Sequence, residues 1–424
     1  MAFNYEKGAV ARKLAFLAVA GVMAWMGGKE FLELRNYKEQ VVVSDSFTEK
    51  KMLSDWFPPI KGTGVDTPVY VFDSGVPGSS MFYLGGTHPY EPATSMSAYV
   101  MMENIKVKKG RVLIAPHANY SASTVGMLGN AYPKFFHVET DHGLRRYRIG
   151  DRNTAPVDQW PDPFTYVHYP SGQNLDYTDS RNLNRTYPGR PDGNLTEQLT
   201  YAIMEVNRKE NITLFVDSHE ASLMYPVGAT YVAHDRSLDM AMMASMVLTA
   251  SEFPMKCEAS PKSLRGLSHR DAGDFCDSYV VLMETPEPFI DRVAGKITEK
   301  LMMDGKDEFL QTAAEHGLLY CDYDIKVGYP MWDRVGRHLS GALEMINQMN
   351  DFLIDEPEKE LLVEFPRHPD LKEKGLGAFL HDPATAQESV PRLIRLVFRA
   401  ASGRPRTALS GCRRENNFSG GIHS

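Results

Sequence analysis

The sequence predicts an α/β fold in which a mixed sheet is flanked by helices. Short apolar runs rich in β-branched and aromatic residues alternate with longer segments of helical spacing. This alternation is typical of sheets whose strands are parallel or mixed. Several apolar runs end in His, Asp or Glu, and ligands gather at the carboxyl ends of strands in such sheets. We therefore expect one large domain with its site at that edge.

Each expected element has a local signal. Apolar runs bounded by Gly, Pro or polar residues predict strands over 69–72, 81–84, 111–115, 213–216 and 279–283. Helical spacing and start signals predict helices over 92–105, 195–209, 238–249 and 290–303, and an apolar stripe from Val335 to Phe352 predicts another. Residues 119–173 show no sustained period, so we expect a long loop at the rim of the site.

The N-terminus predicts a signal peptide or membrane anchor over residues 1–28. Lys7, Arg12 and Lys13 precede an uncharged stretch from Leu14 to Gly28. An export signal or anchor would place the protein in the periplasm, outside the cell or on the membrane, and an anchor would associate with the membrane through this segment. The alternative is a cytosolic amphipathic helix in a cytoplasmic protein.

The remaining boundaries follow from changes in composition along the 424 residues. We expect a polar linker over 29–65, a catalytic domain over 66–356, a small appendage over 357–390 and a basic, disordered tail over 391–424. The formal net charge of −8 argues against nucleic acid as a partner. Cys257 and Cys276 flank one loop-like segment, so an exported chain could join them, and free thiols are the alternative.

Two short motifs suggest a metal site. His88 and Glu91 follow the apolar run 81–84 within Gly-Gly-Thr-His-Pro-Tyr-Glu, and His219 ends another run within Phe-Val-Asp-Ser-His-Glu. Two imidazoles and one carboxylate form a catalytic zinc set that leaves a coordination position for water. Taken alone, the first motif is weak, because a histidine at a helix start beside an exposed glutamate is common.

Two further segments strengthen this interpretation. Residues 180–189 read Ser-Arg-Asn-Leu-Asn-Arg-Thr-Tyr-Pro-Gly between the two metal motifs, and Glu284 ends the run 279–283. In this order the motifs resemble those of the zinc carboxypeptidase superfamily, and within it the succinylglutamate desuccinylase/aspartoacylase family. That family typically has Gly, Asp and Phe where this chain has Pro89, Asn182 and Tyr187. These departures remove no expected ligand.

The resemblance implies a site in which His88, Glu91 and His219 hold one Zn²⁺ per chain. Glu284 would take a proton from the zinc-activated water and pass it to the leaving amine. Arg181 would stabilise the oxyanion, and Asn184 and Arg185 would bind a substrate carboxylate. The alternatives are an exposed Arg181, a structural ion pair at Arg185 and a surface role for Glu284.

Four other polar residues lie in or near these motifs. Asp217 is placed to orient His219, and His117 and His269 are additional pocket candidates. Glu220 should point to the opposite side of its strand from His219, because side chains alternate along a strand.

The implied activity is hydrolysis of an amide bond in a small molecule or short peptide that bears a free carboxylate. The first hypothesis is an N-acyl amino acid deacylase, and the alternative is a metallocarboxypeptidase acting on short or cell-wall peptides. A third reading, an inactive metal-binding surface protein, conflicts with the retention of Glu284, because a protein that only binds needs no proton shuttle.

Overall fold

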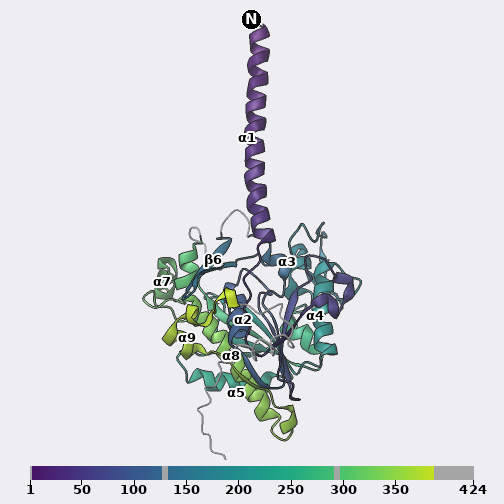
Figure 1. The fold of residues 1–424 in the computed structure, drawn as a ribbon, viewed down its shortest axis with the longest axis vertical. Coiled ribbons are helices and arrows are strands. Elements are labelled where there is room, and N and C mark those ends of the chain that lie inside the picture. Colours follow the sequence, from purple (N-terminus) through teal and green to yellow (C-terminus); the bar gives the residue numbers. More distant parts are fainter. Residues whose placement is uncertain (1, 127–131, 291–296, 386–424) are drawn as a thin grey trace, which may run out of the picture. The chain divides into compact units, whose positions relative to one another are not determined.

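The computed structural model describes residues 2–126, 132–290 and 297–385 (Figure 1). At its centre is an eight-stranded mixed sheet with the order β1-β2-β5-β3-β10-β13-β11-β12. The neighbours β5, β3, β10 and β13 run parallel, β1 and β2 extend one edge antiparallel, and β11 pairs antiparallel with β13 and parallel with β12. The strands are β1 (Phe47–Met52), β2 (Pro68–Asp73), β3 (Ser80–Leu84), β5 (Arg111–Ala115), β10 (Leu214–Ser222), β11 (Thr230–Ala233), β12 (Lys256–Ala259) and β13 (Tyr279–Glu287).

Helices cover both faces of this sheet. Their bounds are α2 (Pro92–Asn104), α3 (Tyr120–Ser123), α4 (Leu195–Lys209), α5 (Leu238–Thr249), α6 (Glu299–Asp304), α7 (Glu308–Glu315), α8 (Met331–Phe352) and α9 (His368–Lys374). Small two-stranded sheets pair β4 (Lys106–Lys109) with β14 (Leu362–Glu364), β6 (Phe135–Thr140) with β7 (Gly143–Arg148), and β8 (Tyr166–Val167) with β9 (Asn174–Leu175). The predicted mixed sheet between helices is confirmed.

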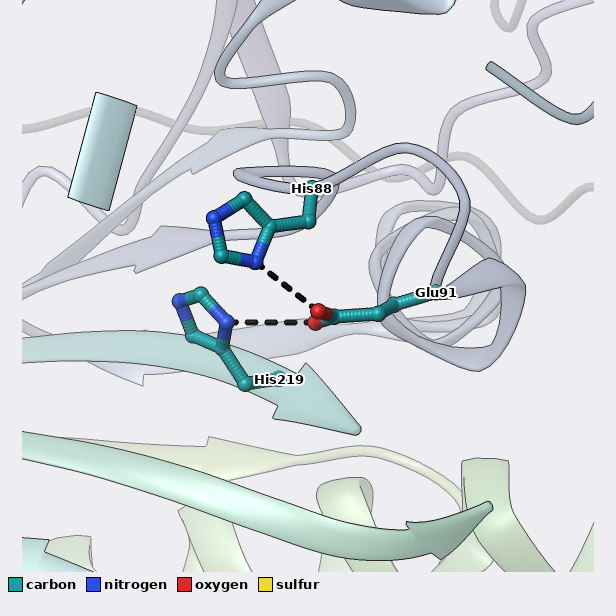
Figure 2. A group of neighbouring side chains, drawn as sticks. All are labelled: His88, Glu91 and His219. Atoms are coloured by element: carbon teal, nitrogen blue, oxygen red, sulfur yellow. Dashed lines mark hydrogen bonds and ion pairs between the residues drawn. The ribbon is translucent and has the colours of Figure 1, made fainter. Parts of the chain in front are cut away.

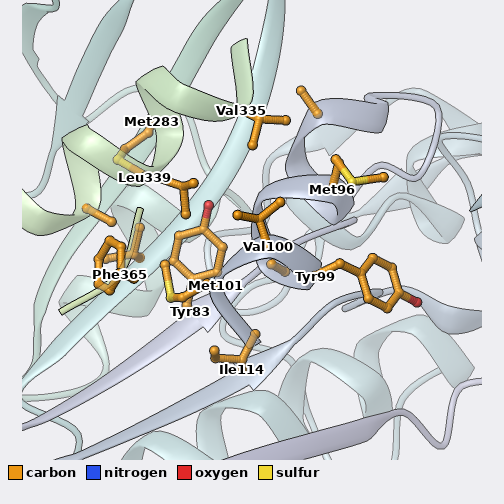
Figure 3. Close-up of a cluster of buried hydrophobic side chains, with 14 of the residues drawn as sticks. Tyr83, Met96, Tyr99, Val100, Met101, Ile114, Met283, Val335, Leu339 and Phe365 are labelled. Carbon is orange, nitrogen blue, oxygen red and sulfur yellow. The ribbon is translucent and has the colours of Figure 1, made fainter. Parts of the chain in front are cut away.

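Strand alternation divides the core into two clusters, one on each face of the sheet. On one face Tyr83, Ile114 and Met283 pack with α2 and α8, and Figure 3 shows this cluster between the sheet and the two helices. On the other face Phe82 and Phe215 pack with α4. Because neighbouring residues of a strand face opposite sides, each central strand is buried on both faces. Such a sheet holds the side chains at its carboxyl edge rigidly.

Several expected elements appear with the expected bounds. The strand over 111–115 and the helices over 195–209 and 238–249 match β5, α4 and α5, and α2 ends one residue before the predicted 105. The predicted strands over 213–216 and 279–283 correspond to β10 and β13, which continue to Ser222 and Glu287. The predicted helix over 290–303 overlaps only α6, and its residues 291–296 lie outside the described residues.

Other segments differ from expectation. The expected linker over 29–65 contains β1, which pairs with β2 as the edge of the main sheet. The expected long loop over 119–173 contains the β6–β7 hairpin, because Phe136, Val138 and Tyr147 bury one face of it. Cys257, Cys276 and Cys321 are free thiols, so the disulfide considered between the first two is absent. The tail expected over 391–424, including Cys412, lies outside the described residues.

The N-terminal segment forms the helix α1 (Ala2–Asn36). Its portion Gly8–Asn36 is long and apolar enough to cross a membrane, and none of its most apolar window is buried within the protein. Leu14, Phe16, Met23 and Trp25 are among its exposed apolar side chains. A signal sequence has the same character, so this helix is compatible with either a signal or an anchor.

Candidate metal centre

The connection from β3 to α2 places the first two metal-binding candidates. Gly86 has a φ of +59°, and a side chain there would bring its Cβ to 2.6 Å from Ser95 Oγ and 3.0 Å from the Pro116 carbonyl oxygen. Only glycine suits such a backbone in so little space. The chain then turns through His88 to Glu91, which is the N-cap residue of α2. This tight turn directs both side chains towards the end of β10.

The structure brings His88, Glu91 and His219 together. His88 Nδ1 lies 2.8 Å from Glu91 Oε1, and His219 Nδ1 lies 3.1 Å from Glu91 Oε2, as Figure 2 shows. All three side chains are buried, and their ligand atoms lie within 4.8 Å of one another. Both imidazoles therefore present the same ring nitrogen to one carboxylate, although they come from distant parts of the sequence.

The opposite nitrogen of each ring contacts an oxygen. His88 Nε2 lies 2.9 Å from Asn182 Oδ1, and His219 Nε2 lies 3.1 Å from Asp217 Oδ2. Metal-binding histidines usually donate their second N–H to an oxygen in this way, which fixes the tautomer and leaves the other nitrogen for the metal. Two Nδ1 atoms and a carboxylate match the ligand types of a catalytic zinc site. The residues present fit the metal that the resemblance implies.

Asp217 is itself held in place by neighbouring side chains. Its Oδ1 accepts a hydrogen bond from Thr87 Oγ1 at 2.7 Å, and its Oδ2 accepts one from Ser268 Oγ at 2.5 Å. Burial opposes the protonated form of His219, but Asp217 and Glu91 outweigh it and raise the pKa of this ring well above its ordinary value. Asp217 therefore orients His219, as the sequence suggested, and strengthens the ring as an electron donor.

Glu284 lies beside His219 across the sheet. The two residues are register partners on the parallel strands β10 and β13. Burial raises the pKa of Glu284 to about 8, while the positive charge of His219 opposes this shift. Its Oε2 is buried and makes no hydrogen bond to the described residues. A carboxylate with a free oxygen next to the metal ligands is available to move a proton.

Arg181 is engaged in another interaction. Its Nε and Nη2 donate to the two carboxylate oxygens of Asp162 at 2.7 and 3.0 Å, and its Nη1 donates to the Thr154 carbonyl at 2.9 Å. This two-pronged ion pair holds the guanidinium in a structural contact. The structure does not bring Arg181 into contact with the three metal-binding candidates.

A second arginine, which the sequence analysis missed, acts on the site. Burial has the largest effect on three groups of the site: it lowers the pKa of His88 and of Arg185 and raises the pKa of Glu284. The positive charge of Arg152 acts to lower the pKa of each of the three groups. The next residue, Asn153, forms a backbone bridge with Asn182, the partner of His88. The available signal was an arginine upstream of the 180–189 motif, inside the segment 119–173 that was expected to be a loop.

Asn184 and Arg185 lie in the 3₁₀ turn Leu183–Arg185. Asn184 Oδ1 accepts a hydrogen bond from Ser268 N at 2.8 Å, and Arg185 Nη1 donates to the Asn184 carbonyl at 2.7 Å. Burial lowers the pKa of Arg185, and Glu284 is among the groups that oppose the shift. Arg185 is thus a largely buried cation whose charge interacts with that of Glu284, beside the candidate metal ligands.

The two additional histidines are buried. His269 Nδ1 lies 2.8 Å from Ser260 Oγ, and burial together with the charge of His219 lowers the pKa of this ring to about 3. His117 Nδ1 lies 3.2 Å from Ser95 Oγ, and its Nε2 lies 3.5 Å from Glu39 Oε1. Neither belongs to the group of candidate metal ligands among the described residues.

Glu220 faces away from His219, as predicted. One of its oxygens accepts a hydrogen bond from Arg334 Nη1 of α8 at 2.6 Å, and the other accepts one from Ala93 N at 2.7 Å. Its own backbone N–H donates to Glu91 Oε2 at 3.0 Å. Glu220 therefore contacts the candidate ligand Glu91 through its backbone N–H and is not itself among the candidate ligands.

No protein-family profile and no curated protein matches the sequence. Among solved structures, the chain is similar to an ectoine utilization protein from Ruegeria pomeroyi, with 20% identity, a TM-score of 0.32 and coverage of 51% of this chain and 52% of that one. It is similar to a succinylglutamate desuccinylase from a Silicibacter species, with 17% identity, a TM-score of 0.31 and coverage of 61% and 63%. It is also similar to a metallo-carboxypeptidase from Burkholderia cenocepacia, with 10% identity, a TM-score of 0.40 and coverage of 76% of this chain and 68% of that one.

The chain spans about half of the first of these proteins and somewhat under two thirds of the second. The neighbours thus include both branches that the motifs resemble, the succinylglutamate desuccinylase/aspartoacylase proteins and the metallocarboxypeptidases. At these TM-scores the similarities carry no information about chemistry.

Proposed function

We propose that this protein is a zinc-dependent hydrolase that cleaves an amide bond in a substrate bearing a free carboxylate. The supporting observation is the geometry of His88 and His219. Each ring has its Nε2 against an oxygen acceptor and its Nδ1 against the carboxylate of Glu91. In this proposal His88, Glu91 and His219 hold one zinc ion, which when bound supplies a Lewis acid that polarises the scissile carbonyl and acidifies water.

Glu284 is the proposed proton shuttle. It accepts a proton from the attacking water as the new C–O bond forms, and it returns the proton to the nitrogen as the C–N bond breaks. The products are a carboxylic acid and an amine. The free Oε2 and the register with His219 support this role, because the acceptor must lie close to the attacking oxygen without itself being held by other donors.

A positive donor is needed for the developing oxyanion. Arg181 was the candidate from the motif, but its guanidinium is bound to Asp162 and the Thr154 carbonyl. Arg152 is the better candidate, because its charge acts on His88, Glu284 and Arg185 together. Arg181 then acts as a positioning residue that holds the segment around Asn182.

Arg185, together with Asn184, is the proposed binding group for the substrate carboxylate. A guanidinium can pair with a carboxylate through two parallel hydrogen bonds, and a buried cation gains more from such a partner than an exposed one. These groups suit an N-acyl amino acid, which makes a deacylase the first candidate. A short peptide with a free C-terminus offers the same carboxylate.

The second candidate is a metallocarboxypeptidase acting on short or cell-wall peptides. The apolar helix α1 favours it, because a chain that is exported or anchored on the outer face of a membrane would meet peptides there. In either case we propose that α1 remains as a membrane anchor. A panel of N-acyl amino acids and a panel of short peptides, each assayed with and without added zinc, distinguishes the two candidates. Activity on neither panel would favour a protein that binds metal without catalysis.

Metal analysis of the purified chain tests the proposed centre. We expect about one zinc per chain, as in mononuclear catalytic sites. His88→Ala and His219→Ala should lose it, whereas Glu284→Gln should retain zinc and lose turnover by about a hundredfold or more, because glutamine cannot accept the proton. His137→Ala is the matched control, since His137 lies 3.0 Å from Glu299 in a similar pair outside the site. Full zinc content in both ligand variants would overturn the assignment.

A further inference from the structure

One surface loop exposes large apolar side chains. Residues 157–164, here called the apolar loop, include Val157, Trp160 and Phe164. Val157 is 63% exposed, Trp160 is 74% exposed and Phe164 is fully exposed. Single exposed apolar residues are common, but three within eight residues form a patch that favours contact with a partner or a membrane. The proposed chemistry uses none of these three side chains.

The apolar loop is joined to the end of α1. Asp158 accepts hydrogen bonds from Arg35 Nη1 and Nη2 at 2.8 and 2.6 Å, and Arg35 Nη1 also donates to Thr124 Oγ1 at 2.8 Å. Only a quarter of the Arg35 side chain is exposed, and Asp158 is nearly buried. This paired contact fixes Asp158, two residues before Trp160, against the last turn of α1.

A second contact joins the same loop to the candidate site. Asp162 accepts two hydrogen bonds from Arg181, one residue before the Asn182 that contacts His88. Trp160 therefore lies between two acidic residues that are each fixed by an arginine. The backbone on either side of Trp160 is therefore held by an ion pair, and Val157 and Phe164 each lie within two residues of one of these anchored positions.

The position along α1 sets the depth at which a bilayer would meet the loop. The uncharged stretch ends at Gly28, and Arg35 lies seven residues later. At a rise of 1.5 Å per residue this is about 10 Å along the helix. The headgroup region on each side of the hydrocarbon core is about 5–8 Å thick. Arg35 and its partner Asp158 would therefore lie within a few ångströms of that region.

We propose that the apolar loop is a second membrane contact that lies on the lipid interface beside α1. This inference rests on the anchor role given to α1 above. Trp160 supplies an amphipathic ring, and such rings concentrate at the boundary between lipid and water. Val157 and Phe164 supply apolar surface whose transfer from water into the lipid interface is favourable. The two ion pairs of the loop would then place the metal centre at a fixed height above the bilayer.

Tryptophan quenching in vesicles tests the contact. The full chain is reconstituted in phosphatidylcholine and phosphatidylglycerol vesicles with or without brominated acyl chains. Trp25→Phe removes the anchor signal, and the difference between Trp25→Phe and Trp25→Phe/Trp160→Phe isolates Trp160. We expect that isolated signal to fall by at least about twofold in brominated vesicles, because interfacial tryptophans lie near the acyl chains.

The matched control places a tryptophan on the opposite edge of the sheet. Ile354 is 72% exposed and lies near Lys359, whose carbonyl accepts a hydrogen bond from Ser79 N at the amino end of β3. Ile354→Trp, introduced into Trp25→Phe/Trp160→Phe, should add a signal that bromine does not quench. Equal quenching of the Trp160 signal and of the signal added by Ile354→Trp would overturn the proposal.

The remaining outcomes separate the loop from the anchor. Quenching of Trp25 without quenching of Trp160 would overturn the loop contact and leave the anchor intact. If neither tryptophan is quenched, both the loop contact and the anchor are overturned. Protection of Trp160 from aqueous iodide, without quenching by brominated lipid, would show that a second copy of this chain covers the loop and would overturn the lipid assignment.

Discussion

Two arginines near the candidate metal centre have different surroundings, and this difference decides their roles. The guanidinium of Arg181 donates hydrogen bonds to Asp162 and to the Thr154 carbonyl. The charge of Arg152 acts instead on His88, Arg185 and Glu284. An arginine can stabilise an oxyanion only with donors that point at the reacting carbonyl. Arg181 is therefore a poor candidate for this role, and Arg152 is proposed because its charge reaches three groups of the site.

Substitution of the two arginines should separate these roles. We expect Arg152→Ala to lower kcat by about 10²- to 10³-fold, as for loss of one oxyanion donor, with little change in zinc content. Arg181→Ala should mainly lower thermal stability, because it leaves Asp162 without its partner. Arg190→Ala, at a more exposed arginine that also pairs with an acid, is the control. A large kcat loss in Arg181→Ala with unchanged Tm would restore the oxyanion role to Arg181.

Arg185 offers a separate test at the residue scale. Arg185→Ala should lower kcat/KM for acid substrates, since it removes binding that ground and transition states share. The loss should disappear when the substrate carboxylate is replaced by an amide. Steady-state kinetics on matched acid and amide substrates measures this. Equal losses on both would mean that Arg185 serves the fold and not recognition.

The metal-binding candidates were predictable because their signal is local. His88 and Glu91 lie three residues apart in a glycine-rich turn, and His219 ends an apolar run. Arg152 was not found, because it lies in the segment 119–173, which has no regular period, and its importance comes from proximity in space. The ion pair of Arg181 was hidden for the same reason, since Asp162 lies in a segment without a regular period.

Strand β10 shows how a buried polar sequence can hide an element. The apolar run stops at Val216, yet the strand continues through Ser222 with every residue buried. Asp217, His219 and Glu220 remain in the sheet because each polar group has a partner there. A pattern of apolar residues detects burial only where burial is apolar. In the same way, buried charges such as Arg145 and Arg148 masked the β6–β7 hairpin.

The pair Glu220–Arg334 links β10 to α8, and both side chains are completely buried. Replacing Arg334 with methionine leaves a buried carboxylate without its charge partner. We expect the free energy of unfolding to fall by about 3–5 kcal/mol, measured by chemical denaturation. Arg208→Met, which breaks the exposed pair with Glu205, should cost less than about 1 kcal/mol. Equal effects of the two variants would contradict the structural importance of this pair.

At the scale of the whole molecule, the residues that the structure describes belong to one compact unit. The segments on either side of the expected catalytic domain join its sheet and helices through β1 and α9. Composition predicted their polar character but not their packing, because an edge strand and a solvated linker can have similar residues. The free thiols of Cys257, Cys276 and Cys321 mean that this unit is held without a disulfide among the described residues.

The role of α1 can be tested on the full chain. We expect a tagged protein to stay in the membrane fraction after an alkaline wash. Val19→Glu/Val22→Glu should release it, because a charge at the centre of a spanning helix costs about 2.5–3.5 kcal/mol. Leu318→Glu, at an exposed position outside α1, should not. A wild-type chain found in the soluble fraction with an intact N-terminus would contradict the anchor.

The alternation of side chains at the end of β10 also limits how this protein can evolve. His219 faces the metal-binding candidates, whereas the adjacent Glu220 faces Arg334 on the other side of the sheet. A single-residue insertion or deletion within β10 would exchange the two faces. The imidazole would then meet an arginine, and a carboxylate would enter the metal centre. Homologues should therefore vary in the composition of this strand while keeping its length, with insertions and deletions confined to the loops on either side.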